Sequence, residues 1–153
     1  MCYGWLIMQN GREVRTGLGG YAHWKLATSN GAEYLALISG LQTLADMGLC
    51  GEDLIIQGDS KTTIEQMQKQ ALTHSLRIQQ FHRQARKLCR MFDSIEWRWA
   101  PRQQNHSADR LTKQALEQIR VREPGYFSPE VLQMIPPEER IGLRPILACS
   151  FSA

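Results

Sequence analysis

Several features are missing from this sequence of 153 residues, and each absence argues against a class of protein. No apolar run approaches the length that spans a bilayer, and the apolar start at residues 3–8 is too short for a secretory core and has no basic residues before it. The four cysteines lie far apart, without the Cys-x-x-Cys spacing of a zinc site or the pattern of a disulfide framework. Internal repeats and low-complexity tracts are also lacking. We therefore expect a protein of the reducing cytoplasm that does not contact membranes.

Size and charge narrow the choice of protein class further. A chain of this length with 42% hydrophobic residues is long enough for one ordinary domain with its own hydrophobic core, but too short for two such domains. Eighteen Lys and Arg against fifteen Asp and Glu is a small excess, which permits a polyanionic partner without identifying one. We expect one domain over residues 1–122, acting as a monomer, and a tail over residues 123–153 in which prolines break any long element. Residues 146–151 are suited to a short edge strand within that tail.

Apolar periodicity predicts a mixed α/β domain with helices packed on a sheet. Asn10 and Gly11 form the kind of turn that joins two strands in a tight hairpin, and the expected strands cover residues 5–8 and 13–15. Further strands are expected at residues 21–26, 54–56 and 95–99. Helical spacing indicates helices that begin near residues 30, 60, 78 and 107. The run at 54–56 is continuously apolar, which is typical of a strand covered on both faces.

Two groups of side chains have an ordinary structural explanation. Trp97 and Trp99 alternate along one face of an expected strand, where aromatic side chains more often fill a core than stack on bases. The helix that begins near residue 78 carries cationic side chains beside its apolar stripe, and such a face is usually only solvated. These cationic residues are Arg77, Arg83, Arg86, Lys87 and Arg90.

Three carboxylates stand at the ends of predicted elements. Glu33 lies one helical turn before Leu37, on the stripe that faces the core, where an acid is rarely placed without a partner. Asp59 follows the apolar run at 54–56, at the carboxyl edge where open α/β sheets bind ligands. Asp109 lies near the start of the last helix, beside its apolar face. Acids that point toward one sheet edge repel each other, and a divalent cation relieves that repulsion. Hard oxygen ligands of this type suit magnesium or manganese.

Each of these carboxylates also has a purely structural explanation. An acid such as Glu33, if it lies in the first turn of a helix, is favoured by the helix dipole by about 0.3–1 kcal/mol. Asp59 at the start of a helix can be its N-cap, which is worth about 1 kcal/mol over alanine. Asp109 can be a solvent-exposed acid in the first turn of the last helix. The three acids together are harder to explain in this way than any one of them alone.

Three motifs occur in order along the chain, each on a fitting element. They are Thr28-Ser29-Asn30-Gly31-Ala32-Glu33-Tyr34, then Gly58-Asp59-Ser60-Lys61, then Trp99-Ala100-Pro101-Arg102 with Asn105-His106-Ser107-Ala108-Asp109-Arg110-Leu111. Together they resemble type 1 ribonuclease H, most closely its archaeal-like branch, over about residues 3–120. The resemblance implies a five-stranded sheet flanked by helices, with Glu33, Asp59 and Asp109 as metal-binding acids. The implied activity is endonucleolytic hydrolysis of the RNA strand of RNA–DNA hybrids, with two Mg²⁺ or Mn²⁺ ions about 3.5–4 Å apart.

The same resemblance implies a set of substrate-binding residues. Ser29 and Asn30 would contact the minor groove and read ribose hydroxyls, the groups that distinguish RNA from DNA. Thr28 would help to hold a phosphate of the DNA strand. The remaining members of the implied set are Ser60, Lys61 and Asn105. The implied partner is an RNA–DNA hybrid, with double-stranded RNA as a second partner.

The chain departs from the family pattern at its beginning. The family starts with a central strand that ends in an Asp-Gly pair and supplies an acid shared by both metals, whereas no residue before Glu13 is acidic. Loss of such a strand would leave buried backbone groups unpaired, at about 1–3 kcal/mol for each group. Three explanations stay open. The start codon is assigned too late or the chain is a fragment of a longer product; the protein is a degenerate, non-catalytic relative; or residues 146–151 take the place of the central strand in a permuted arrangement. The family's loop histidine also has no clear counterpart, because His106 is better explained as a surface residue at a helix start.

Two other functions are compatible with these departures. A catalytically silent relative would bind hybrids or double-stranded RNA without cutting them, and this binding would depend strongly on salt. A purely structural interaction domain would reuse the fold and bind no hybrid at all. The magnesium-dependent endonuclease remains the leading hypothesis.

Overall fold

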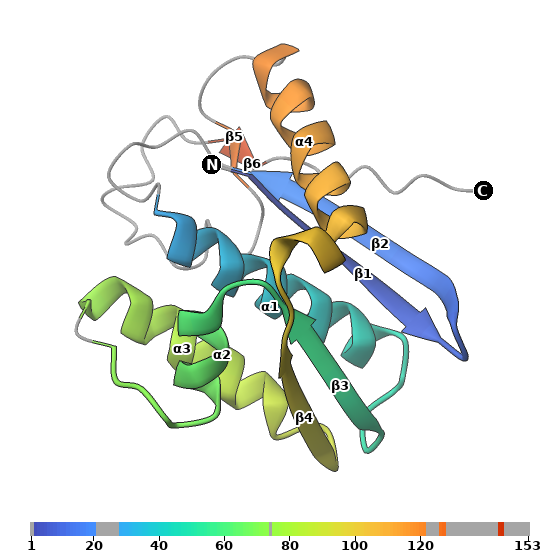
Figure 1. The fold of residues 1–153 in the computed structure, drawn as a ribbon, viewed down its shortest axis with the longest axis vertical. Coiled ribbons are helices and arrows are strands. Elements are labelled where there is room, and N and C mark those ends of the chain that lie inside the picture. Colours follow the sequence, from blue (N-terminus) through green and yellow to red (C-terminus); the bar gives the residue numbers. More distant parts are fainter. Residues whose placement is uncertain (1, 21–27, 74, 122–125, 128–143, 146–153) are drawn as a thin grey trace.

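A computed structural model describes residues 2–20, 28–73, 75–121, 126–127 and 144–145 of the chain (Figure 1). The elements are β1 (Cys2–Gln9), β2 (Arg12–Gly20), α1 (Ser29–Asp46), β3 (Asp53–Gly58), α2 (Lys61–Met67), α3 (Leu76–Cys89), β4 (Ser94–Trp99), the short 3-10 helix η1 (Arg102–Gln104) and α4 (His106–Val121). Beyond them, β5 (Tyr126–Phe127) and β6 (Arg144–Pro145) pair in parallel. The mixed α/β fold predicted from the sequence is confirmed.

β1 and β2 form the antiparallel hairpin that the sequence predicts. Both turn residues, Asn10 and Gly11, have positive φ angles of 53° and 76°, as a tight two-residue turn requires. The two strands extend further than expected, with one irregularity of register near the turn. The strand expected at residues 21–26 and the edge strand expected at residues 146–151 lie outside the described residues.

β3 and β4 form a parallel pair whose strands end at the same edge. The register runs from Asp53 opposite Ser94 to Gly58 opposite Trp99, and α2 and α3 make the connection between the two strands. Asp59 follows β3 directly, so it lies at the carboxyl edge of this pair. Ligands bind at such edges in α/β folds.

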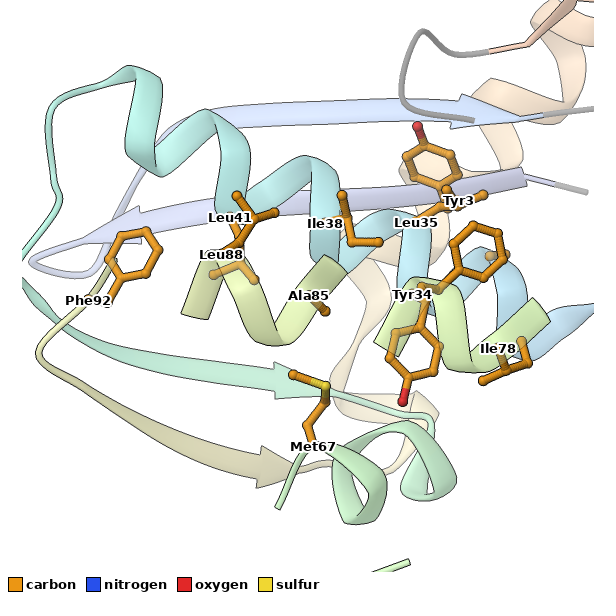
Figure 2. Close-up of a cluster of buried hydrophobic side chains, with 12 residues drawn as sticks. Tyr3, Tyr34, Leu35, Ile38, Leu41, Met67, Ile78, Ala85, Leu88 and Phe92 are labelled. Carbon is orange, nitrogen blue, oxygen red and sulfur yellow. The ribbon is translucent and has the colours of Figure 1, made fainter. Parts of the chain in front are cut away.

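The described strands do not form the single five-stranded sheet that the resemblance implies. Within the described residues, β1 and β2 make one two-stranded sheet, and β3 and β4 make another. The arrows of β1 and β3 run in opposite directions (Figures 1 and 2). A strand between them would therefore be antiparallel to β1 and parallel to β3. No described strand has that position, which is why the two pairs stay separate.

α1 lies at the centre of the hydrophobic core, between the β1–β2 hairpin and α3 (Figure 2). Tyr34, Leu35, Ile38 and Leu41 of α1 are each at most 2% exposed. The apolar stripe predicted along residues 78–92 packs against them and is buried. Both helical stripes that the sequence predicts are therefore confirmed, and α1 is held on two sides.

The β3–β4 pair is covered on one face, which differs from the expectation for a continuously apolar strand. Leu54 and Ile56 pack against the core, whereas Ile55 between them is 59% exposed. On β4, Trp97 packs against the core as expected, but Trp99 is 52% exposed. The expectation for Ile55 and Trp99 was wrong because the core formed around α1 lies on one side of this pair and does not reach the end of β4.

α4 packs across β1 and β2, and it confirms the helix predicted at residues 107–120 (Figure 1). The two elements approach each other closely at Gly4, where an added Cβ would lie 2.5 Å from the Cβ of Leu111 and 3.0 Å from the carbonyl oxygen of Ala108. Interiors are packed too closely to absorb such overlaps, so this position requires glycine. The close approach places Asp109, in the first turn of α4, beside β1.

Three smaller expectations concern the cationic face of α3, membrane-spanning helices and the cysteines. Arg86 is half-buried and donates to the backbone oxygen of Met67 at 3.2 Å, while the other cationic residues of α3 are exposed, in agreement with a solvated face. In the part of the chain that the structure describes, no helix is both long enough and apolar enough to cross a membrane. Among the described residues, Cys2, Cys50 and Cys89 form no disulfide.

Candidate metal and nucleic-acid site

A cavity of about 240 Å³ lies where β1, α1, the end of β3 and the start of α4 meet. Glu33, Asp59 and Asp109 all line it. The other lining residues are Cys2, Tyr3, Gly4, Ser29, Ala32, Ala36, Arg102, Asn105, Ala108 and Thr112. Three acids from remote segments of the chain thus share one cavity, at the edge where the sequence predicts a ligand site.

Glu33 projects from α1 into this cavity, and its surroundings penalise a charge. Burial raises the pKa of Glu33 to about 7, the negative charge of Asp59 adds to this effect, and the Arg102 guanidinium opposes it. The dipole explanation does not apply, because α1 begins at Ser29 and has no acid in its first turn. A half-buried carboxylate whose charge is penalised by its surroundings marks a candidate functional group.

Asp59 lies between the end of β3 and the start of α2, but it is not the helix cap. The N-cap is Ser60, whose hydroxyl accepts the backbone N–H of Thr63 at 3.3 Å. Asp59 instead accepts a hydrogen bond at Oδ1 from Nδ2 of Asn105, at 3.3 Å. Its backbone oxygen accepts the indole N–H of Trp99 at 3.1 Å. The structural explanation by capping is therefore wrong, and the carboxylate remains available to a ligand in the cavity.

Asp109 is held by two cations rather than being a freely solvated acid. Its Oδ1 accepts a hydrogen bond from Nη2 of Arg102 at 2.5 Å, and its Oδ2 lies 2.8 Å from Nζ of Lys113. The hydrogen bond from Lys113, followed by that from Arg102, lowers the pKa of Asp109 to about 2. Asp109 is therefore a permanent anion at neutral pH, with both carboxylate oxygens engaged.

Although Glu33, Asp59 and Asp109 line one cavity, they do not form a ready-made cation cage. Among the described residues, no group of three His, Cys, Asp or Glu side chains is close enough to hold a metal ion. Arg102 interacts most strongly with Asp109 and more weakly with Asp59 and Glu33, and these interactions raise the pKa of Arg102. A cation entering the cavity therefore competes with Arg102 and Lys113 for the Asp109 carboxylate.

The donor set nevertheless suits a hard divalent cation. All three acids offer carboxylate oxygens, the ligands that Mg²⁺ and Mn²⁺ prefer. Repulsion from Asp59 already contributes to the raised pKa of Glu33, so a cation bound by both carboxylates would remove an unfavourable interaction.

Arg102 also belongs to this site, although no role was predicted for it from the sequence. It stands on η1, the short turn between β4 and α4, and faces an acid seven residues further along the chain. A signal was present in the sequence, because a basic residue directly after the strand-ending Pro101 lies between the segments that carry Asp59 and Asp109.

The residues predicted to bind substrate lie around the starts of α1 and α2. Thr28 is the N-cap of α1, and its hydroxyl accepts the backbone N–H of Gly31 at 3.1 Å. Ser29 is exposed and lines the cavity. Asn30 is half-buried and accepts a hydrogen bond from the hydroxyl of Thr63 at 3.0 Å.

The other predicted substrate residues are divided between the cavity and the surface. Asn105 lines the cavity and orients Asp59, whereas Ser60 caps α2 beside it. Lys61 is 71% exposed and lies 3.7 Å from Glu65, one helical turn away, an arrangement worth little to stability. His106 is exposed at the start of α4, as the sequence predicts.

The fold and the acidic cavity together define a ribonuclease H-like α/β protein. A family model described as reverse transcriptase-like matches residues 3–115 of the chain. The chain belongs to this family.

Several solved structures of ribonuclease H proteins are similar to the chain. The ribonuclease H1 of Halobacterium salinarum is 31% identical with a TM-score of 0.69, and the match covers 76% of this chain and 86% of that one. The N-terminal ribonuclease H domain of Rv2228c from Mycobacterium tuberculosis is 28% identical with a TM-score of 0.70, over 76% of this chain and 82% of that one. LC11 ribonuclease H1, solved with an RNA/DNA hybrid, has a TM-score of 0.70 over 76% of this chain and 86% of that one; at 21% identity it supports the fold alone.

Curated relatives give the same family at the level of sequence. Ribonuclease HI of Halobacterium salinarum is 35% identical over 91 residues, which cover 60% of this chain and 45% of the relative. The bifunctional protein Rv2228c of Mycobacterium tuberculosis is 34% identical over 91 residues, 60% of this chain and 24% of the relative. The chain thus spans less than half the length of these curated relatives.

Proposed function

We propose that the chain is an endoribonuclease domain that hydrolyses the RNA strand of RNA–DNA hybrids with the help of divalent cations, Mg²⁺ or alternatively Mn²⁺. The observation that carries this proposal is the meeting of Glu33, Asp59 and Asp109 in one cavity, although they come from three remote elements. The raised pKa of Glu33 supports it, because burial and the charge of Asp59 disfavour an ionised Glu33 in the absence of a cation. The family supports the same activity, since a 35% identical relative is named ribonuclease HI.

In the proposed reaction Glu33, Asp59 and Asp109 would hold the cations. Cations held there would supply a water of lowered pKa and stabilisation of the leaving oxygen of the phosphodiester. Asn105 keeps the Asp59 carboxylate in place through its hydrogen bond to Oδ1. Arg102 and Lys113 hold Asp109 in its ionised form, and a bound cation would replace at least one of them on its carboxylate.

We assign the substrate to the surface beside this cavity. Ser29 lines the cavity and stands next to Asn30, and both would meet the minor groove of the hybrid. Thr28 would hold a phosphate of the DNA strand, while the other proposed contacts are Ser60, Lys61 and Asn105. We further propose a monomer that acts in the cytoplasm, with double-stranded RNA as a second partner.

A second candidate function is hybrid binding without hydrolysis. The observation that favours it is the absence, among the described residues, of any group of three acids close enough to hold a metal ion. By resemblance, a fourth acid would stand on a strand between β1 and β3, and the sequence has no acid before Glu13. A binder of this kind would keep the cavity and the residues around it, but it would not hydrolyse the RNA strand.

Incubation with an end-labelled RNA–DNA hybrid and Mg²⁺ or Mn²⁺ tests the enzyme directly. We expect cleavage of the RNA strand, and we expect Glu33→Gln and Asp59→Asn each to reduce it to background. Asp46→Asn at the exposed end of α1 is the matched control and should leave cleavage unchanged. Cleavage that survives both site substitutions would defeat the assignment.

A fusion separates the two candidate functions. Placing a strand that ends in Asp-Gly before Met1 should raise cleavage if the chain is an enzyme domain. Tight, salt-sensitive hybrid binding that never turns into cleavage, even in this fusion, would favour the silent binder.

A further inference from the structure

Thr63 is a buried polar side chain that links the starts of two helices. It lies in the first turn of α2 and is 5% exposed. Its hydroxyl donates to Oδ1 of Asn30 on α1, at 3.0 Å. The same hydroxyl oxygen lies 2.9 Å from Oγ of Ser60, the N-cap of α2. One buried hydroxyl therefore joins two residues that the proposed function places at the substrate.

This arrangement differs from that of two helical threonines elsewhere in the protein. Thr43 and Thr112 each donate to the backbone oxygen four residues earlier in the chain, at 2.9 and 3.0 Å. That local bond is the usual way for a helical threonine to satisfy its hydroxyl. For Thr63 the corresponding oxygen belongs to Asp59, and it accepts an indole N–H from β4. The Thr63 hydroxyl is directed to another helix instead.

The directions of these hydrogen bonds fix the side-chain amide of Asn30. The Thr63 hydroxyl has a single proton, which it gives to Oδ1 of Asn30. The Ser60 hydroxyl can then donate to Thr63, and Ser60 Oγ accepts the backbone N–H of Thr63 at 3.3 Å. Because Oδ1 of Asn30 is engaged on the Thr63 side, the Nδ2 group is turned away from it. An amide nitrogen can only donate, so Asn30 presents a donor.

We propose that Thr63 is a positioning residue that turns the Asn30 amide donor toward the nucleic acid and so favours a hybrid over a DNA duplex. The inference rests on the proposed function, because it requires Asn30 to meet the substrate. The RNA strand offers 2′-oxygens that accept hydrogen bonds in the minor groove, and DNA has none. An amide that rotates freely would have to be ordered when the hybrid binds, and this loss of side-chain entropy would reduce the preference.

Binding without hydrolysis measures this preference. The dissociation constants for an RNA–DNA hybrid and for a DNA duplex of the same sequence are determined by fluorescence anisotropy, in EDTA and at one salt concentration. Thr63→Val keeps the shape of the side chain and removes the hydroxyl. We expect it to reduce the ratio of the two constants by about three- to tenfold, the range of one hydrogen bond. Thr63→Ser should restore the ratio. Thr43→Val removes a helical hydroxyl elsewhere and should leave the ratio unchanged.

A second measurement reports the orientation of Asn30 without nucleic acid. In ¹H–¹⁵N spectra, the two side-chain amide signals of Asn30 should move toward the positions of a free amide in Thr63→Val and stay in place in Thr43→Val. A hybrid preference and amide signals that are both unchanged in Thr63→Val would overturn the inference while the proposed function stands. A wild-type chain that shows no hybrid preference would instead overturn the proposed function, and with it the role in specificity.

Discussion

Removing the charge of Glu33 should stabilise the metal-free protein above neutral pH. The pKa of Glu33 rises from 4.5 to about 7 on folding, so between these values the folded chain holds a proton that the unfolded chain has lost. The free energy of unfolding therefore falls as the pH rises through this window. Each unit of pKa difference corresponds to about 1.4 kcal/mol, which gives a loss of about 3 kcal/mol at most by pH 8. Glu33→Gln cannot ionise and escapes this loss.

Urea unfolding in EDTA at pH 4.5 and pH 8 measures the effect. The variant and the wild type should be closest in stability at pH 4.5, and the variant should be more stable by about 1–3 kcal/mol at pH 8. Glu117→Gln is the control, because this exposed position on α4 should change stability by less than about 0.5 kcal/mol. Equal stability of wild type and Glu33→Gln at pH 8 would refute the claim that burial and Asp59 penalise this charge.

Three further substitutions test separate parts of the structure. Tyr34→Phe removes a buried hydroxyl that donates to Oε1 of Gln66 at 2.9 Å, and it should lower the free energy of unfolding by about 1–3 kcal/mol in urea. Gly4→Ala would place a Cβ 2.5 Å from a side-chain carbon of α4, and it should lower stability by about 1–3 kcal/mol in thermal unfolding. Arg102→Gln removes a hydrogen bond to Asp109, so a carboxylate titration by NMR should show a higher pKa for that group. Unchanged values in these assays would contradict the corresponding contacts.

Local chemistry made much of the fold predictable from the sequence. Asn10 and Gly11 adopt the positive φ angles that their identities favour, and the periodic stripe around Ile38 forms a core helix. These features depend on neighbouring residues alone. Ile55 and Trp99 were misjudged because their exposure depends on which elements cover the β3–β4 pair, and a run of apolar residues carries no such information.

The sequence predicted which residues belong to the candidate site better than it predicted which residues they interact with. The sequence placed Glu33, Asp59 and Asp109 at element ends, and the structure brings them to one cavity. Whether Asp59 or its neighbour Ser60 caps α2 is a difference of one residue, which propensities cannot decide. The pairing of Arg102 with Asp109 depends on how η1 turns the chain, and this geometry follows from tertiary packing.

The central claim is that these three carboxylates together bind a divalent cation. Titration of the protein with Mn²⁺, followed by calorimetry, tests it most directly. We predict saturable binding that is weakened by each of Glu33→Gln, Asp59→Asn and Asp109→Asn, and unchanged in Asp46→Asn. Saturable binding that all three site variants retain, or no binding by the wild-type protein, would contradict the account.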